Sequence, residues 1–237
     1  MIWQVPRIWE NADVWILGGG PSVPKQFGIP DHITRQVIEG SLPPSAYSPY
    51  MSFLHDKHVI GINVAYMIGD WIDMLFFGDK GFFLTHQQGI ANFKGIRVSC
   101  TPEMSNYTWV KYLARDTKKV KGISDNPKMV SWNHNSGSAA ISVAANAGAK
   151  RIILLGFDMT LGSTKNQHWH DVYKRGQITT EKKIKALPFE RHLRGFSAIA
   201  HDAKRRGIEI INASPDSAIV EFRKVSVREL IEQEVLV

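Results

Sequence analysis

The sequence is poor in cysteine. Cys100 is the only cysteine among 237 residues, so an internal disulfide and a cysteine-based zinc site are both excluded. Chains without disulfides are typical of reducing compartments, and we expect a cytoplasmic location.

Long hydrophobic runs are also missing. No apolar run approaches the roughly 18 residues that a membrane span needs. The apolar stretch near the N-terminus follows Arg7, Glu10 and Asp13, and it runs into glycines rather than a small-residue cleavage site. We therefore predict neither a membrane span nor a signal peptide.

The overall composition is that of a globular protein with a substantial core. Hydrophobic residues make up 43% and charged residues 22%, and the length suits one domain over residues 1–237. The formal net charge of +7 raises the alternative of nucleic-acid binding. The basic residues form separate short clusters, however, several of them at the ends of predicted helices, which favours a small anionic substrate.

Short apolar runs alternate with helical segments along the chain. This order predicts an α/β, Rossmann-like fold, with a mostly parallel sheet and helices on both faces. The predicted strands are 13–17, 58–62, 74–77, 97–100, 129–132, 151–155 and 208–211, and the predicted helices are 136–147, 189–206 and 227–235. Segment 29–50 has no clear pattern, and the long, polar, basic segment 160–188 is predicted to be a lid-like loop.

A glycine-rich turn follows the first predicted strand. Gly18, Gly19 and Gly20, with Ser22 beyond them, let a phosphate approach backbone amides closely. The turn is not a P-loop, because no Gly-Lys-Ser/Thr follows, and Val23 stands where the dinucleotide fingerprint needs its third glycine. We predict nucleotide contacts from this turn; the alternative is a tight connection without a ligand.

The start of helix 136–147 is a second candidate anion site. Free amides at a helix start attract anions, although the same residues serve equally well as a structural cap. One helix terminus contributes at most about 2 kcal/mol toward an anion, whereas micromolar affinity needs about 8 kcal/mol. Several contacts must therefore act together. The candidates are Asn135, Ser136, Gly137 and Ser138 here, and Asn63 and Asp79 after other strands, where they would meet the base or ribose.

Two histidines and an aspartate are the candidate catalytic residues. Asp158 follows the strand 151–155, and His168 and His170 lie further along the loop. Histidines two residues apart point the same way in an extended segment. They suit general base catalysis or, with Asp158 as an oxygen ligand, metal binding; ordinary loop residues are the alternative. Mg²⁺ is left open as a cofactor, with Asp79 and Asp158 as its ligands.

Basic and aromatic residues surround these candidates in the sequence. Lys174, Arg175 and Arg191 are predicted to neutralise phosphate when the lid-like loop closes; a solvated charged loop is the alternative. The candidates for stacking on a base or sugar are Trp109, Trp132, Trp169 and Tyr173.

Taken in order, these blocks resemble a known family. The blocks are the turn 18–22, Asn63, the helix start 135–138, Gly156-Phe157-Asp158, the two histidines and segment 212–217. They resemble the bacterial sialyltransferases that use CMP-activated sialic acid. They are also similar to the related flagellin-glycosylation factors and to the archaeal hydroxymethyl-dihydropterin pyrophosphokinases.

The resemblance implies a set of roles. It implies His168 or His170 as the base for an acceptor hydroxyl, and nucleotide contacts from Gly19, Ser22, Asn63, Ser136, Gly137 and Asp158. This sequence departs from the family at two points. Met159-Thr160 replace the tyrosines that the family places after Gly-x-Asp, and Asp79 stands where an asparagine is usual.

Three functions follow as hypotheses. The first is a transferase that uses a nucleotide-activated small-molecule donor, in particular an inverting glycosyltransferase, with the acceptor and the oligomeric state left open. The second is a Mg²⁺-dependent pyrophosphokinase that uses ATP. The third is a non-catalytic module that binds nucleotides or nucleic acid.

Overall fold

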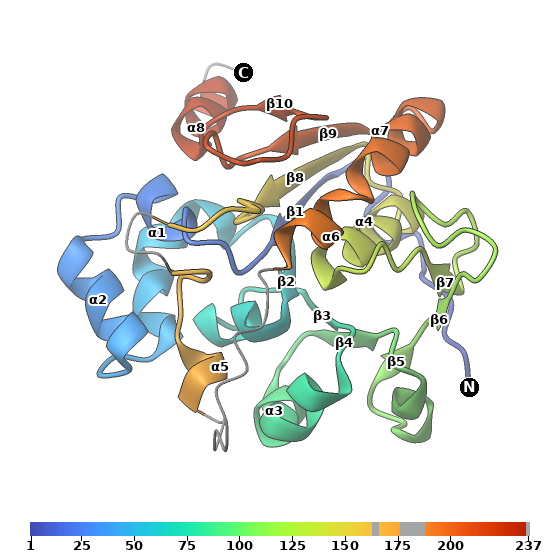
Figure 1. The fold of residues 1–237 in the computed structure, drawn as a ribbon, viewed down its shortest axis with the longest axis horizontal. Coiled ribbons are helices and arrows are strands. Elements are labelled where there is room, and N and C mark those ends of the chain that lie inside the picture. Colours follow the sequence, from blue (N-terminus) through green and yellow to red (C-terminus); the bar gives the residue numbers. More distant parts are fainter. Residues whose placement is uncertain (163–165, 176–187, 236–237) are drawn as a thin grey trace.

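The structure, a computed structural model of the chain, describes residues 1–162, 166–175 and 188–235, without the side chains of Lys174, Arg175 and Val235. In this part of the chain, eight strands form one sheet in the order β10-β9-β8-β1-β2-β3-β4-β5, and all neighbours are parallel (Figure 1). They are β1 (Asp13–Leu17), β2 (His58–Ile62), β3 (Met74–Phe77), β4 (Ile96–Ser99), β5 (Lys111–Tyr112), β8 (Arg151–Leu155), β9 (Glu209–Asn212) and β10 (Arg223–Lys224). A second small sheet pairs β6 (Ala114–Arg115) with β7 (Met129–Val130).

Helices cover both faces of the large sheet (Figure 1). The α-helices are α1 (Val23–Gln26), α2 (Asp31–Glu39), α3 (Lys80–Asn92), α4 (Ser136–Asn146), α5 (Val172–Arg175), α6 (Phe189–Leu193), α7 (Phe196–Arg205) and α8 (Val227–Val235). Three 3-10 segments are η1 (Pro44–Leu54), η2 (Asn63–Ile68) and η3 (Pro102–Asn106). No helix in the described ranges is both long enough and apolar enough to cross a membrane.

The alternation of side chains along β1 creates two apolar cores. Val14 and Ile16 belong to one core with residues of α4 and α7, whereas Trp15 and Leu17 belong to the other with residues of α3 and α8. All residues of α4 after Ser136 are buried. The alanine-rich sequence of α4 suits this position, because small side chains let a helix pack closely on the sheet.

The strand order reverses beside β1. The chain continues from β1 to β2 on one side, whereas β8 pairs with the other side of β1. A crevice forms at such a switch point, outside the carboxyl ends of the strands, and it is the usual ligand site of open α/β sheets. The glycine turn, Asn63, Asp79 and Asp158 all follow strands at this end of the sheet.

The predicted fold class is confirmed. Strands β1, β2, β3 and β8 and helix α8 have the predicted bounds, and Gly148, with a φ of 103°, lies just beyond the end of α4. The predicted strand 129–132 contributes only Met129–Val130, and it joins the small sheet.

The prediction of one long helix over 189–206 is wrong. The structure has two helices, α6 and α7, separated by Arg194 and Gly195. Gly195 is buried, and a Cβ atom there would lie 2.8 Å from Asn133 Oδ1, so this point packs tightly against another segment. The apolar spacing continues across the break, which is why it predicted one helix. Helices α2 and α3 and segment η1 were not predicted.

Candidate functional site

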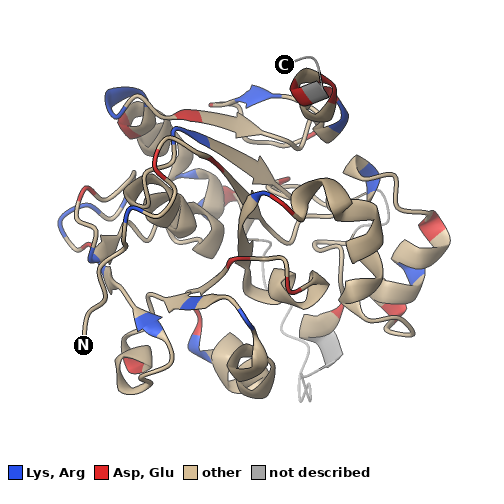
Figure 2. Ribbon diagram, turned by 180° about the vertical axis from the view of Figure 1, so that it is seen from behind, with Lys and Arg blue, Asp and Glu red and all other residues tan. Residues whose placement is uncertain are grey.

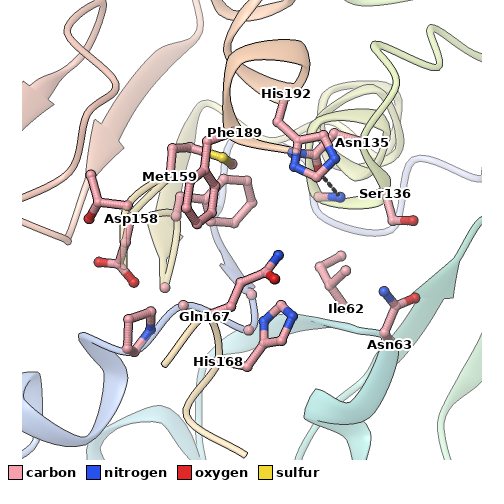
Figure 3. A pocket seen from close by; sticks show the side chains of 18 of the residues that line it. Ile62, Asn63, Asn135, Ser136, Asp158, Met159, Gln167, His168, Phe189 and His192 are labelled. Carbon is pink, nitrogen blue, oxygen red and sulfur yellow. Dashed lines mark hydrogen bonds between the residues drawn. The ribbon is translucent and has the colours of Figure 1, made fainter. Parts of the chain in front are cut away.

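A cavity of about 270 Å³ lies at the switch point (Figure 3). It is bounded by residues that follow β1, β2, β3 and β8 and by the start of α4. Residues of α6 and some residues of segment 167–173 complete its wall. The predicted site residues that line it are Gly18, Gly19, Gly20, Asn63, Asp79, Asn135, Ser136, Gly137, Asp158, His168 and Arg191. Residues that are far apart in the sequence thus share one cavity.

Gly18 and Gly20 pack too closely on the β8 loop to carry a side chain. A Cβ atom on Gly20 would lie 1.9 Å from Asp158 Oδ2 and 2.5 Å from the Gly156 oxygen. The backbone amides of the turn are mostly occupied: the Gly18 amide donates to Leu155 O (2.7 Å) and the Gly20 amide to Gly156 O (2.9 Å). The Gly19 amide makes no hydrogen bond within the described residues, so it is the donor of the turn that a ligand can use.

Ser22 does not line the cavity. Its amide donates to Asp158 Oδ2 (3.2 Å), and its hydroxyl lies 3.2 Å from the Ser214 hydroxyl. Burial raises the pKa of Asp158, and the bonds from Ser22 oppose this rise. Ser22 therefore holds the Asp158 carboxylate in place, whereas the sequence predicted a direct nucleotide contact.

The helix start is capped by the chain itself. Asn135 Oδ1 accepts hydrogen bonds from the amides of Gly137 (2.8 Å) and Ser138 (3.3 Å). The Ser138 side chain is fully buried outside the cavity, so its predicted contact with a nucleotide is not available in this arrangement. Among the first helical amides, that of Ser136 has no partner in the described part of the chain, and Ser136 lines the cavity.

The two predicted catalytic histidines are adjacent but not equivalent. Their rings stack with centroids 5.2 Å apart and planes 5° apart, as expected for an extended His-x-His segment. His168 lines the cavity, and its Nδ1 lies 3.0 Å from where a Cβ of Gly19 would be. His170 is buried behind it and does not line the cavity.

Two further histidines face the cavity, and the prediction of catalytic residues did not include them. His192 on α6 and His134 before α4 both line it, together with Arg191 (Figure 3 shows His192 above Ser136). Burial, together with smaller contributions from the positive charges of Arg191, His168 and His134, lowers the pKa of His192 to about 4. His192 is therefore neutral at pH 7.

Strained backbone concentrates around the cavity. Five non-glycine residues in the described part of the chain have positive φ, and three of them line the cavity: Asn63 (51°), His134 (57°) and Met159 (53°). Such conformations cost on the order of 1 kcal/mol or more each and collect at functional sites. A methionine is especially unusual there, because asparagine and histidine tolerate the left-handed region better.

Asn63 and Asp79 form a polar wall with Tyr173. Asn63 Oδ1 is buried and accepts no hydrogen bond from the described residues. Burial raises the pKa of Tyr173, hydrogen bonds with Asn63 and the Val64 backbone oppose this rise, and the charge of Asp79 adds to it, so the phenol stays protonated. Asp79 also has a structural role that the sequence did not predict: its Oδ1 accepts the Phe82 amide (3.0 Å) and caps α3.

Two of the four aromatic stacking candidates line the cavity and two do not. Trp132 and Tyr173 line the cavity, and the Arg115 guanidinium lies 3.9 Å from the ring centroid of Trp132. Trp109 is half-buried and packs near Phe83 against the core, and Trp169 is completely buried beneath the glycine turn. Neither Trp109 nor Trp169 lines the cavity.

The predicted metal ligands lie in the described structure, whereas much of the predicted lid lies outside it. Asp79 and Asp158 both line the cavity, but no three His, Cys, Asp or Glu side chains of the described residues are grouped as metal ligands. Most of the predicted lid-like loop 160–188, including Lys182, Lys183 and Lys185, and the side chains of Lys174 and Arg175 lie outside the described part of the structure. Elsewhere, Lys and Arg occupy many separate elements, interspersed with Asp and Glu (Figure 2).

Comparisons with known proteins find a likeness in fold. No protein-family model matches the sequence, and no curated protein matches it. The MAf glycosyltransferase from Magnetospirillum magneticum AMB-1 is 10% identical with a TM-score of 0.57; the match covers 99% of this chain and 38% of that one. The sialyltransferase CstII from Campylobacter jejuni, solved with CMP-3FNeuAc, is 13% identical over 90% of this chain and 86% of its own, with a TM-score of 0.47.

The second likeness is too weak to carry an argument, and neither supports the pyrophosphokinase alternative. This chain thus has the fold of a region of the MAf glycosyltransferase, and it spans about 38% of that protein's length.

Proposed function

We propose that this chain is a transferase that binds a nucleotide-activated donor in the switch-point cavity, and more narrowly an inverting glycosyltransferase. One observation carries the proposal. Gly19 and Ser136, whose amides have no partner among the described residues, line the same cavity from segments far apart in the sequence. Amide donors at a glycine turn and a helix start suit a phosphate.

The other walls supply the remaining contacts of a donor. Asn63 offers an acceptor, Oδ1, that has no partner among the described residues, and Trp132 offers an aromatic surface held by Arg115. Arg191 at the start of α6 adds positive charge on the side of Ser136. We assign the nucleotide to these walls, and the phosphate to the space between Gly19 and Ser136.

The chemistry needs one base and no covalent nucleophile. The acceptor oxygen attacks the anomeric carbon as its proton passes to a neutral histidine, and the bond between that carbon and the phosphate oxygen breaks, with its electron pair leaving on the phosphate. His168, which lies against Gly19, is the first candidate for the base. His192, on the side of Ser136, is the second, and His170 does not reach the cavity.

A nucleotide screen tests the binding claim. CMP, CDP, UDP, GDP and ATP are each added with and without Mg²⁺, and thermal unfolding is followed. A nucleotide at about 100 times its Kd should stabilise the protein by about 2.7 kcal/mol. If no nucleotide stabilises it while binding to a polynucleotide is strong and steeply salt-dependent, the proposal is wrong and the nucleic-acid alternative is favoured.

Turnover tests the catalytic claim. With the nucleotide sugar that contains the best-binding base, release of the nucleotide is measured for His168→Ala, His192→Ala and His170→Ala. Loss of the base should lower turnover about 100- to 10,000-fold with little change in nucleotide Kd. His170→Ala is the matched control. Full turnover by both the His168 and His192 variants would exclude a cavity histidine as base.

A further inference from the structure

Trp169 makes an unusual pair of contacts with the glycine turn. Its indole N–H donates to the Gly18 oxygen (2.9 Å), and its backbone N–H donates to the Gly19 oxygen (3.1 Å). The side chain is 0% exposed. Two consecutive carbonyls of the turn therefore point at one buried residue.

Because the peptide bond is planar, these contacts also determine which way the N–H groups of the turn point. In a trans peptide the C=O and the following N–H point in opposite directions, and the described chain contains no cis peptide. When the Gly18 C=O points toward Trp169, the Gly19 N–H points away from it. The Gly20 N–H likewise points away and meets the oxygen of Gly156, a residue that lines the cavity. The Gly20 amide thus points toward the β8 loop, which lines the cavity, and the Gly19 amide is also directed away from Trp169.

We propose that Trp169 is a positioning residue for the donor phosphate: by holding the Gly18 and Gly19 carbonyls, it presents the Gly19 amide to the cavity. The inference rests on the proposed function, because it concerns the phosphate of the same donor. Trp169 does not line the cavity, so it acts through the turn.

Tyr47 extends this support away from the cavity. Its hydroxyl donates to the Trp169 oxygen (3.2 Å), and the two rings pack with centroids 5.6 Å apart. Burial raises the pKa of Tyr47 to about 12, so the hydroxyl remains a donor at neutral pH. Tyr47 lies in η1, within the proline-containing segment for which the sequence predicted no structure. This segment thereby acquires a role at the phosphate site.

The chain offers a matched pair of tryptophan substitutions. Trp169→Phe keeps a buried ring but removes the indole donor to Gly18. Trp15→Phe makes the same chemical change on β1, in a side chain that is 2% exposed and whose indole nitrogen has no partner among the described residues. Both variants lose similar volume in the same core, and only the first loses a bond to the turn.

The experiment measures the contribution of the phosphate to binding. Calorimetry gives Kd for CMP, UMP, GMP and AMP and for their four nucleosides, and the readout is the nucleoside-to-nucleotide Kd ratio for the tightest pair. Loss of one neutral hydrogen bond corresponds to about a three- to tenfold change. We expect Trp169→Phe to lower the ratio by that factor through weaker nucleotide binding, and Trp15→Phe to leave it unchanged. A merely structural effect would weaken the nucleoside and nucleotide equally.

Tyr47→Phe is the second variant, and it decides the question if Trp169→Phe does not fold. It removes only the hydroxyl that holds the Trp169 carbonyl, and we expect the ratio to fall about threefold. A wild-type ratio in Tyr47→Phe, and in Trp169→Phe where it folds, would overturn this inference and leave the proposed function intact. If the wild-type protein binds no nucleotide more tightly than its nucleoside, the proposed function fails, and this inference fails with it.

Discussion

The glycine turn and the helix start line the same cavity, but their amides are held in different ways. At the turn, Trp169, Gly156 and Leu155 bond the backbone directly, and a neighbouring carboxylate fills the space beside Gly20. At the helix start, a single side chain, that of Asn135, occupies two amides. Several hydrogen bonds to its backbone fix the turn, whereas the single side chain that caps the helix start can rotate away. We therefore predict a rigid phosphate contact at the glycine turn and an adjustable one at the helix start.

Gly20→Ala should produce the largest effect. Its Cβ would meet Asp158 Oδ2 at 1.9 Å and the Gly156 oxygen at 2.5 Å, so the turn or the β8 loop must move. We expect a loss of about 1–3 kcal/mol in the free energy of unfolding, measured in urea, and no stabilisation by nucleotide.

Gly19→Ala is the matched comparison for that variant. Its Cβ would meet Nδ1 of His168 at 3.0 Å, at the far end of a side chain that can give way. We expect a smaller loss of stability and retained nucleotide binding. Equal effects of the two alanines would show that the turn is not the rigid side of the cavity.

The contrast between the two regions also shows what the sequence could predict. Strand ends and a run of glycines are local patterns, and they predicted that residues after β1, β2, β3 and β8 converge. The sequence left Asn135 open as a cap or as an anion contact, and the structure shows the cap. The burial of Ser138 depends instead on the packing of α4, which no local pattern predicts.

Trp169 illustrates the same limit. It was a candidate for stacking because tryptophans suit bases, and its place beneath the turn depends on η1, for which no helical periodicity was found. His134 directly precedes the predicted helix start, but the sequence does not show its left-handed backbone, and no role was predicted for it.

The helix-start side should respond to pH through His192. Its pKa is about 4 in the folded chain and 6.5 when unfolded, so between these values the unfolded chain binds more protons. Stability should therefore fall as the pH drops from about 6.5 to about 4. We expect about 1–2 kcal/mol, less than the full shift implies because part of the ring is exposed.

Urea unfolding at pH 7 and pH 5 measures this dependence. His192→Gln should flatten it, and His201→Gln, at an exposed histidine on α7, should not. An unchanged slope in His192→Gln would show that this imidazole is not buried as the cavity requires.

Asn135→Ala tests the adjustable side. Loss of the cap should destabilise the protein by about 1 kcal/mol, because the Gly137 and Ser138 amides lose their acceptor. The same amides become free for a phosphate. We therefore expect calorimetry to show nucleotide binding within about threefold of wild type. A loss of binding as large as that of Gly20→Ala would mean that the Asn135 side chain itself holds the ligand.

Ser138→Ala should have the smallest effect. The hydroxyl is fully buried and has no hydrogen-bond partner among the described residues, so its removal leaves nothing unpaired. We expect a change of about 0.5 kcal/mol or less in unfolding free energy, and unchanged nucleotide affinity. Weaker binding would restore the nucleotide contact that the sequence predicted for this residue.

A crystal structure of the protein with its tightest-binding nucleotide tests the central claim most directly. The account predicts phosphate oxygens about 2.7–3.2 Å from both the Gly19 and the Ser136 amide nitrogens. A phosphate that contacts neither amide, or a nucleotide bound outside this cavity, would contradict it.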